Sequence, residues 1–579
     1  MLRSSPSGEA GDHTPAPVES CDVVVIGSGS AALTAALATA VAGLKTVILE
    51  KTDRIGGTSA MSGAGTWVPA NHHARAAGID DSPAEALAYI RAAAPAGWQE
   101  TEDALWQSAV AAAPTMLAFV EARSPLRFAL AGDPDPRLDL PGAKARGRMV
   151  SPLPLRRALL GPLAGKLRPS TLPQIYTYQE VHALDVYHHP LRAGLKMAPV
   201  LAWRWLTGQR AKGAALIVGL LRGALDAGAR IELSARAREL VTEPATGAVT
   251  GVVYEQNGRL HCLHAGKGVV IASGGFEWDP TLRDRHFPGP WDYIASPRGN
   301  EGDGHRMAAA VGAALAHMDQ GNVNPAMPTR YERRLHGLGL FFHREANAIL
   351  VDKNGHRFAD EFAFNIGEIV DRRDPVTGLP LHLPAWLITD SDFLRKAPIV
   401  RLYARHDPRW LVRAPTVEAL ADLIRLPAAT LAATVARFNG FCANGHDADF
   451  GRGARSAEDP KRATGEPALA PIRRAPFYAM PFNRSFLATK GGPRTDEAGR
   501  VRRPDGIVIE GLYCAGVAMA NPIGTRAVGA GTTIGPNMTW GFICARDIAA
   551  RAGVALPGSE AESAPVAPEP DRAQKEPMR

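Results

Sequence analysis

The stretch that decides the fold spans residues 21–50 and reads CDVVVIGSGSAALTAALATAVAGLKTVILE. It begins with branched aliphatic residues at 23–26, a pattern typical of a buried strand. Residues 27–32 then have the GxGxxA spacing of a phosphate-binding loop, and an apolar helix follows. A second predicted strand ends at Glu50. This order of strand, loop, helix, strand and acid predicts a dinucleotide-binding α/β unit.

Each position in this loop has a physical role. Gly27 allows a tight turn, Gly29 lets the backbone approach a pyrophosphate, and Ala32 permits close packing of helix on strand. The N–H groups at the start of the helix attract phosphate, and a carboxylate at Glu50 can accept both ribose hydroxyls. In this unit the residues expected to bind the cofactor are Gly27, Ser28, Gly29, Ser30, Ala31, Ala32, Glu50 and Lys51.

The residues that follow favour FAD over NAD. Two glycine-rich clusters occur at 56–59 and 62–65, where backbone amides can reach a diphosphate and a flat ring. The segment GGTSAMSGAGTWVPAN at 56–71 resembles the flavoprotein family of fumarate reductase and 3-ketosteroid Δ1-dehydrogenase. The succinate dehydrogenase branch has a histidine there that bonds FAD covalently, and the segment at 56–71 contains no histidine. The resemblance therefore implies non-covalent FAD, with these further contacts: Gly56, Gly57, Thr58, Ser59, Ser62 and Gly63.

Three later segments match the same family. VVIASGGF at 269–276 is a predicted strand that ends in small residues, GDG at 302–304 opens a predicted helix, and GLYCAG at 511–516 is a returning strand. The helix predicted within 528–549 would direct its N-terminal amides to the flavin C2 carbonyl. The cofactor residues implied here are Ala272, Ser273, Gly274, Asp303, Gly516, Gly531, Thr533 and Ile534.

The resemblance covers about residues 20–553 and implies an α/β fold. We expect a discontinuous Rossmann-like FAD-binding domain with an inserted α+β catalytic cap domain. The expected boundaries are a disordered tail at 1–19, the first part of the FAD-binding domain at 20–289 with a basic helical insertion at about 110–225, the cap at 290–479, the second part of the FAD-binding domain at 480–555, and a disordered tail at 556–579.

The catalytic residues of the family are not retained intact. In the ketosteroid branch one tyrosine acts as base and a second donates to the ketone together with a glycine N–H. Alignment puts Asn365 at the first tyrosine, Ala527 at the second and Gly531 at the glycine. In fumarate reductases an arginine proton donor occupies the Asn365 position, and Arg526 lies one residue from the position of an arginine clamp.

Other side chains are therefore candidates for the chemistry. His343 and Arg344 precede a predicted hairpin in the cap, and Arg526 precedes the glycine loop. Candidate phenols for proton transfer are Tyr293, Tyr331 and Tyr478. Each has a structural alternative: Arg526 can pair with a carboxylate, His343 can be a satisfied or an exposed histidine, and a tyrosine often only packs.

These observations predict an FAD-dependent oxidoreductase acting on a CH–CH bond next to a carbonyl. The expected substrate is a small apolar ketone of steroid type, with an unidentified electron acceptor. Two alternatives remain: an enoate reductase of the fumarate type, with Arg526 and Arg344 holding a carboxylate, and a flavin-binding protein without this catalysis.

Composition and charge limit the classes of protein to which this chain can belong. The chain has 579 residues, of which 46% are hydrophobic and 21% charged, as is usual for globular proteins. Five scattered cysteines favour neither disulfides nor a thiolate metal site, and we predict no metal and a cytoplasmic protein. Residues 143–222 carry a net charge of +11 against +7 for the whole chain. This stretch predicts either solvated helices or a surface for anionic lipid or a phosphate-bearing substrate; nucleic acid is not expected.

Overall fold

The computed structural model describes residues 19–452 and 467–558. The expected tails therefore lie almost wholly outside the described residues. Glu19, which we had placed in the first tail, begins strand β1. At the other end Leu556 is buried against the main core.

The main sheet has eight strands and a parallel centre. β1 (Glu19–Ile26) lies parallel between β2 (Thr46–Glu50) and β11 (Arg259–Ile271). β8 (Arg230–Leu233) extends the sheet beside β2, and β24 (Val508–Cys514) beside β11, both parallel. Three antiparallel additions complete it: β9 (Ala235–Thr242), β10 (Val249–Gln256) and β23 (Arg500–Arg502). The aliphatic residues at 23–25 are fully buried, which explains why this strand is central.

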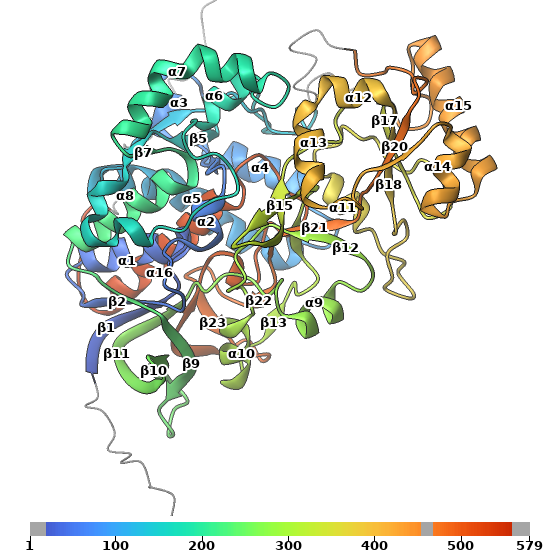
Figure 1. Cartoon of the computed structure of the whole chain (residues 1–579). Coiled ribbons are helices and arrows are strands. Elements are labelled where there is room, and N and C mark those ends of the chain that lie inside the picture. Colours follow the sequence, from blue (N-terminus) through green and yellow to red (C-terminus); the bar gives the residue numbers. More distant parts are fainter. Residues whose placement is uncertain (1–18, 453–466, 559–579) are drawn as a thin grey trace, which may run out of the picture.

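Small residues allow helices to pack closely beside this sheet (Figure 1). α1 (Ser30–Val41) contacts α16 (Ile534–Arg551) and α8 (Lys212–Asp226), and α5 (Gln99–Arg123) contacts α16. A Cβ atom added at Gly541 of α16 would lie 2.2 Å from the Ala31 carbonyl oxygen of α1. This close approach holds α16, a late segment of the chain, against the first helix.

A second layer of structure contains the predicted cap. Its antiparallel sheet has the order β17 (Ala348–Val351), β18 (Trp386–Thr389), β20 (Phe477–Pro481) and β19 (Val412–Ala414). The accompanying helices are α12 (Ser391–Lys396), α13 (Pro398–Tyr403), α14 (Val417–Ile424) and α15 (Ala428–Asn444), with η2 (Ala404–His406). Two hydrophobic clusters form here, apart from the main core.

Short strands join the two layers. β21 (Arg484–Thr489) pairs with both β12 (Trp291–Ile294) and β14 (Gly321–Val323), so residues after the predicted cap pair with residues in its first part. The neighbouring elements are α9 (Pro280–His286), α10 (Asp303–Ala310), β13 (Leu315–Ala316), β15 (Ala326–Tyr331), β16 (Arg334–Gly339), α11 (Ile366–Val370), β22 (Gly492–Pro493) and η4 (Gly516–Ala518).

The basic insertion is only partly helical. α5 and α8, at its two ends, belong to the main core. Between them the chain forms β4 (Phe128–Leu130), β5 (Met149–Pro152), β6 (Leu155–Arg156), η1 (Arg157–Lys166), α6 (Tyr178–Ala183), α7 (Pro190–Leu206) and β7 (Gln209–Arg210). The segment before α5 holds α2 (Gly57–Met61), β3 (Thr66–Trp67), α3 (His72–Ala76) and α4 (Pro83–Ala93).

Candidate active site

A cavity of about 880 Å³ extends from the glycine-rich loop to the cap. One end is lined by residues 26–31 and Glu50, and the other by apolar side chains that include Leu340, Phe341 and Leu487. Of the predicted cofactor-binding residues, all line this cavity except Ala32 and Gly56. Ala32 is buried within α1, and the Gly56 N–H donates to Ser28 Oγ at 2.8 Å. Ala32 and Gly56 therefore support the conformation of the loop without lining the cavity.

The glycine-rich loop fits a pyrophosphate. Gly27 has φ +113°, and a Cβ atom there would lie 2.4 Å from the Ala272 carbonyl oxygen, so the turn requires glycine. At Gly29 an added Cβ atom would come within 4 Å of only one protein atom outside its neighbours, Ser59 Oγ at 3.5 Å. The space in front of this loop is thus open to a ligand, as the dinucleotide role demands.

Charged residues at the same end are held in a network. Glu50 accepts hydrogen bonds from Ser28 Oγ at 2.5 Å and from Thr52 N and Oγ1 at 2.9 and 2.8 Å. Lys51 Nζ pairs with Asp303 at 2.8 Å. Burial alone would raise the pKa of Asp303, but hydrogen bonds from Arg236 and Lys51 outweigh it and lower that pKa. This end therefore presents fixed carboxylates that suit the hydroxyls of a nucleoside.

The glycine loop before α16 fits closely against the Gly63–Gly65 region. Gly531 has φ +85°, and a Cβ atom there would lie 2.7 Å from backbone atoms of Gly65 and of the two residues after it. Trp67 N–H donates to the Gly531 carbonyl at 3.2 Å. Gly531 lines the cavity, with Thr533 and Ile534 after it.

Asn365 lines the cavity but is bonded to the backbone. Its amide Nδ2 donates to the Ala527 carbonyl at 3.0 Å, and its Oδ1 accepts from the Ala527 N–H at 2.9 Å. The two positions where the ketosteroid branch has tyrosines are thus joined to each other. Asn365 is placed to hold the loop that carries Gly531.

Arg526 is paired with a carboxylate. Its Nε lies 2.9 Å and its Nη2 2.6 Å from carboxylate oxygens of Glu368. Glu368 lines the cavity, whereas Arg526 is not among the residues that do. The geometry matches the ion-pair alternative, and the role of Arg526 toward substrate stays a prediction.

His343 and Arg344 differ in their access to the cavity. His343 is fully buried and packs edge-on against Phe482, with ring centroids 5.0 Å apart, and it does not line the cavity. Arg344 lines the cavity, lies 4.5 Å over the Phe341 ring, and donates to the Ala363 carbonyl at 3.2 Å. Of this pair only Arg344 is positioned to meet a ligand.

The tyrosines that line the cavity are not those the sequence suggested. Tyr293 Oη donates to Asp407 at 3.1 Å, Tyr331 accepts from Arg168 at 3.4 Å, and Tyr478 pairs within the cap sheet; none of the three lines the cavity. Among the described residues, the cavity instead has two tyrosines, Tyr178 and Tyr187. Both come from the basic insertion, where no motif marks them.

Tyr178 is paired with a carboxylate and sits against the glycine-rich segment. Its Oη donates to Asp133 Oδ1 at 3.0 Å. Its ring carbons would lie 3.6 and 3.8 Å from a Cβ atom added at Gly63. Burial, with the Asp133 charge second, raises the pKa of Tyr178 well above its ordinary value. The phenol is therefore protonated at neutral pH.

The first turn of α6 holds Tyr178 in place. Thr177 and Glu180 form a reciprocal capping box at the start of the helix. Glu180 also accepts hydrogen bonds from Arg204 of α7 at 2.6 and 2.7 Å. A bidentate arginine pair of this kind restricts orientation as well as distance, so α6 is clamped from both sides.

Lys490 is a second cavity residue that the sequence analysis missed. It is buried, and its Nζ donates to the Gly524 carbonyl at 2.6 Å. Burial lowers the pKa of Lys490 to about 8. Lys490 thus places an ammonium group in the cavity wall whose pKa is not far above neutral pH. A buried cation of this kind suits an anionic group of a ligand.

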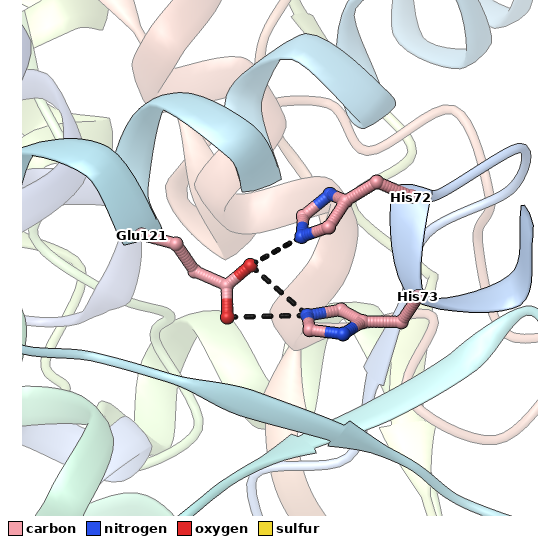
Figure 2. Close-up of side chains that lie close together, drawn as sticks. All are labelled: His72, His73 and Glu121. Atoms are coloured by element: carbon pink, nitrogen blue, oxygen red, sulfur yellow. Dashed lines mark hydrogen bonds and ion pairs between the residues drawn. The ribbon is translucent and has the colours of Figure 1, made fainter. Parts of the chain in front are cut away.

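One cluster of possible metal ligands occurs among residues 19–452 and 467–558, although we predicted none: His72, His73 and Glu121 (Figure 2). The two imidazole Nε2 atoms lie 2.6 and 3.0 Å from Glu121 Oε2, and Glu121 Oε1 accepts from the Phe128 N–H at 2.8 Å. These contacts link α3, α5 and β4 without involving the cavity lining. We interpret the cluster as a set of structural contacts that hold these three elements together.

The fold and the cavity together are those of a protein that binds FAD. A model of the FAD binding domain family matches residues 22–534, and the chain belongs to that family. With 36% identity over 569 residues, covering 95% of this chain and 96% of the relative, it is similar to 4-oxocyclohexanecarboxylate 2-dehydrogenase of Sinomonas cyclohexanicum.

Steroid enzymes are also similar. The 3-oxosteroid 1-dehydrogenase of Mycolicibacterium smegmatis is 33% identical over 580 residues, covering 93% of this chain and 98% of that protein. The crystal structure of 3-ketosteroid Δ1-dehydrogenase from Sterolibacterium denitrificans, in complex with 1,4-androstadiene-3,17-dione, superposes with a TM-score of 0.81 at 32% identity, covering 92% of this chain and all of that one. The protein is thus an FAD-dependent oxidoreductase of CH–CH groups, which confirms the predicted fold class and cofactor.

Proposed function

We propose that the chain dehydrogenates a CH–CH bond next to the carbonyl of a cyclic ketone. The observation that carries this proposal is that two complementary groups border one short segment. Tyr178 contacts Gly63, and Gly531 contacts Gly65. Two residues span at most about 7 Å of extended chain, so Tyr178 and Gly531 border neighbouring parts of the same cavity wall.

The proposed chemistry divides between the cofactor and the chain. FAD, when bound, supplies the hydride acceptor. The Gly531 N–H donates to the ketone oxygen and stabilises negative charge as it develops there. Tyr178 Oη removes the proton from the carbon next to the carbonyl and passes its own proton to the Asp133 carboxylate. The phenol thus ends protonated, as it began, and the proton taken from the substrate is balanced by the one gained by Asp133.

The cavity supports a ketone over an unsaturated dicarboxylate. A clamp of the fumarate type needs two cations free to grip carboxylates, and Arg526 is already bonded to Glu368. The apolar lining, with Leu340, Phe341 and Leu487, suits a hydrocarbon ring. We infer a substrate within the range that the relatives' names span, from a cyclohexanone carboxylate to a 3-ketosteroid. The apolar ketone of steroid type that the sequence predicts is the larger end of this range. Arg344, which lines the cavity, is the cation that we propose meets a substrate carboxylate.

Anaerobic mixing with a substrate panel tests the reaction class. Bleaching of the flavin by 4-oxocyclohexanecarboxylate or a saturated 3-ketosteroid supports the proposal and selects between the two substrate types. Oxidation of chemically reduced enzyme by fumarate, without bleaching by either ketone, would replace the proposal with the enoate reductase. No response to any of the panel would favour a flavin-binding protein without this catalysis.

Two substitutions test the proton-transfer pair. Tyr178→Phe keeps the ring against Gly63 and removes Oη, and Asp133→Asn keeps an acceptor that cannot take up a proton. Each should lower kcat by roughly 10²–10⁴-fold, the usual contribution of general acid–base catalysis, with normal flavin content. Exchange of the substrate's acidic proton with D₂O, followed by NMR, should be lost in parallel.

Tyr187→Phe is the matched control, because that phenol also lines the cavity but donates to the Phe342 carbonyl at 3.4 Å, which cannot accept a proton by transfer. It should retain most of the rate. Wild-type proton exchange in Tyr178→Phe would assign the base elsewhere.

We also propose, from the sequence, a cytoplasmic protein that uses a separate electron acceptor. Among the described residues, the longest apolar helices fall short of what crossing a membrane requires. The basic stretch at 143–222 is the side of the protein that we propose meets an anionic membrane.

A further inference from the structure

We propose that helix α7 docks the protein on an anionic lipid bilayer and so places one wall of the active-site cavity beside the lipid. The docking itself stands independently, whereas its consequence for substrate entry rests on the proposed function. In Figure 1, α7 lies at the outer edge of the molecule, on the side away from β1 and β10.

The first observation is the exposure of apolar side chains on α7. Of twenty large hydrophobic residues exposed in the described chain, six lie in this one helix. They range from Val200, 40% exposed, to Leu191, 83% exposed, and the set is Leu191, Leu195, Val200, Trp203, Trp205 and Leu206. Scattered exposed apolar residues are normal, but a contiguous group marks an interaction surface.

The second observation is the helix's attachment to the protein, which is slight. Only Ala193 and Arg204 of α7 are buried. Arg204 is bonded to Glu180 and to the Ile175 carbonyl, at 2.8 Å for the latter. The helix thus packs on the protein at one residue near each end, while six of its apolar side chains stay exposed within the described chain.

The third observation is the charge that borders this surface. Arg192 and Lys196 are exposed on α7, which has no acidic residue. Arg156 and Arg157 are exposed beside its C-terminal end, because Arg156 pairs with Gln209 and the Arg157 N–H donates to the Gly208 carbonyl at 3.1 Å. Exposed Leu153 and Leu159 lie in the same neighbouring segment.

This combination favours a bilayer over a protein partner. Tryptophans are enriched at membrane–water interfaces, and basic residues flanking an apolar helix face attract anionic headgroups. Part of the positive charge of residues 143–222 does not reach the surface, because Arg148, Arg168 and Arg204 are buried. Of the cations that remain exposed, Arg192 and Lys196 lie on α7 and Arg156 and Arg157 beside it, where they complement anionic lipid.

Docking at this place affects the cavity because α7 directly follows part of its lining. Asp185, Tyr187, His188 and His189, in the segment between α6 and α7, all line the cavity. His188 fixes this segment to the cap through Glu345 at 2.9 Å. A ketone dissolved in the bilayer would then reach the cavity without first crossing bulk water.

Vesicle flotation of the FAD-loaded protein tests the docking. Wild type should float with phosphatidylcholine vesicles that contain phosphatidylglycerol, bind much less to pure phosphatidylcholine, and be released by high salt because exposed charges are then screened. The double variant Trp203→Ser/Trp205→Ser should bind at least 10-fold more weakly. Arg192→Gln/Lys196→Gln should reduce binding to anionic vesicles by roughly fivefold for each cation, following the usual contribution per basic residue.

Leu423→Ser is the matched control, because Leu423 is also exposed but lies on α14 of the cap. It should leave vesicle binding unchanged. Equal binding of wild type to neutral and anionic vesicles, or none, would overturn the proposal. A wild-type dimer that becomes monomeric in the tryptophan variant, without vesicle binding, would instead make α7 an interface between copies.

Turnover separates this proposal from the proposed function. The tryptophan variant should act on a water-soluble cyclic ketone at the wild-type rate but lose its advantage on a ketone presented in vesicles. Normal docking with no ketone oxidised would refute the proposed function alone. Equal rates on the vesicle-borne ketone in wild type and a non-docking variant would refute the entry route.

Discussion

The reciprocal bridge between Asn365 and Ala527 gives a quantitative test of how the glycine loop is held. Asn365→Ala removes two hydrogen bonds, of 3.0 and 2.9 Å, and leaves the Ala527 N–H and carbonyl without these partners. A hydrogen bond contributes about 0.5–1.5 kcal/mol net. The free energy of unfolding should therefore fall by about 1–3 kcal/mol.

The same change should slow the reaction. Ala527 lies four residues before Gly531, whose N–H we propose binds the ketone oxygen. If the whole loss is felt in the transition state, a barrier higher by about 1–3 kcal/mol lowers the rate roughly 5- to 150-fold. Rapid-mixing measurement of flavin bleaching gives this rate, and thermal unfolding of the FAD-loaded protein gives the stability change. Flavin content should be unchanged, and so should the pH dependence, because no titrating group is removed.

A matched variant distinguishes a local effect from general destabilisation. Asn439 makes the same reciprocal bridge with Ile472, at 2.9 and 2.8 Å, in a part of the cap that does not line the cavity. Asn439→Ala should lose similar stability but keep the wild-type rate. If Asn365→Ala is as fast as wild type, the bridge does not position the loop; if its pH profile changes, Asn365 takes part in proton transfer.

Three further predictions concern the cofactor and the charged groups. Gly29→Ala should fold with near-normal thermal stability yet retain less flavin. Gly27→Ala should lose both stability and flavin, because its Cβ atom would lie 2.4 Å from the Ala272 carbonyl oxygen. Flavin absorbance per chain measures the flavin content, and thermal unfolding measures the stability. Arg526→Met should slow flavin bleaching at least ~10-fold, about 1.4 kcal/mol in the barrier, with FAD still bound; an equal loss in Glu368→Gln would mean that Arg526 acts through the ion pair and not on the substrate. Lys490→Met should lower the midpoint potential of the bound flavin, by ~30 mV if the lost cation is worth ~1.4 kcal/mol to the two-electron couple; an unchanged potential would place Lys490 too far from the ring to matter.

The cofactor end was predictable because its determinants are local. The glycines, the small residues and the acid of the first 50 residues belong to one strand–loop–helix–strand unit, so their spacing alone identifies them. Gly27 is a direct example: its conformation can be inferred from the turn it must make, and the structure gives φ +113°. The same holds for the parallel order of β1 and β2.

The proton-transfer end was not predictable in the same way. Tyr178 and Asp133 are 45 residues apart, and neither lies in a recurring pattern. Sequence reasoning named three tyrosines of the expected cap as candidates. In the structure Tyr293 bonds to Asp407 and Tyr331 to Arg168, and neither tyrosine lines the cavity. Charge counting had the same weakness, because it cannot tell Arg204, buried against Glu180, from exposed Arg192.

The contact between Glu180 and Arg204 ties the two proposals together physically. Glu180 stands two residues after Tyr178 on α6, and Arg204 is the buried anchor of α7. Any force on α7 at a bilayer is therefore transmitted to the helix that carries the proposed proton acceptor. A test of docking must change the exposed tryptophans and leave Arg204 intact, because loss of Arg204 would leave Glu180, two residues after Tyr178, without its cation. A defect in Arg204→Met would then appear in turnover of water-soluble ketone as well as in vesicle binding, whereas a defect confined to binding belongs to the lipid-facing surface alone.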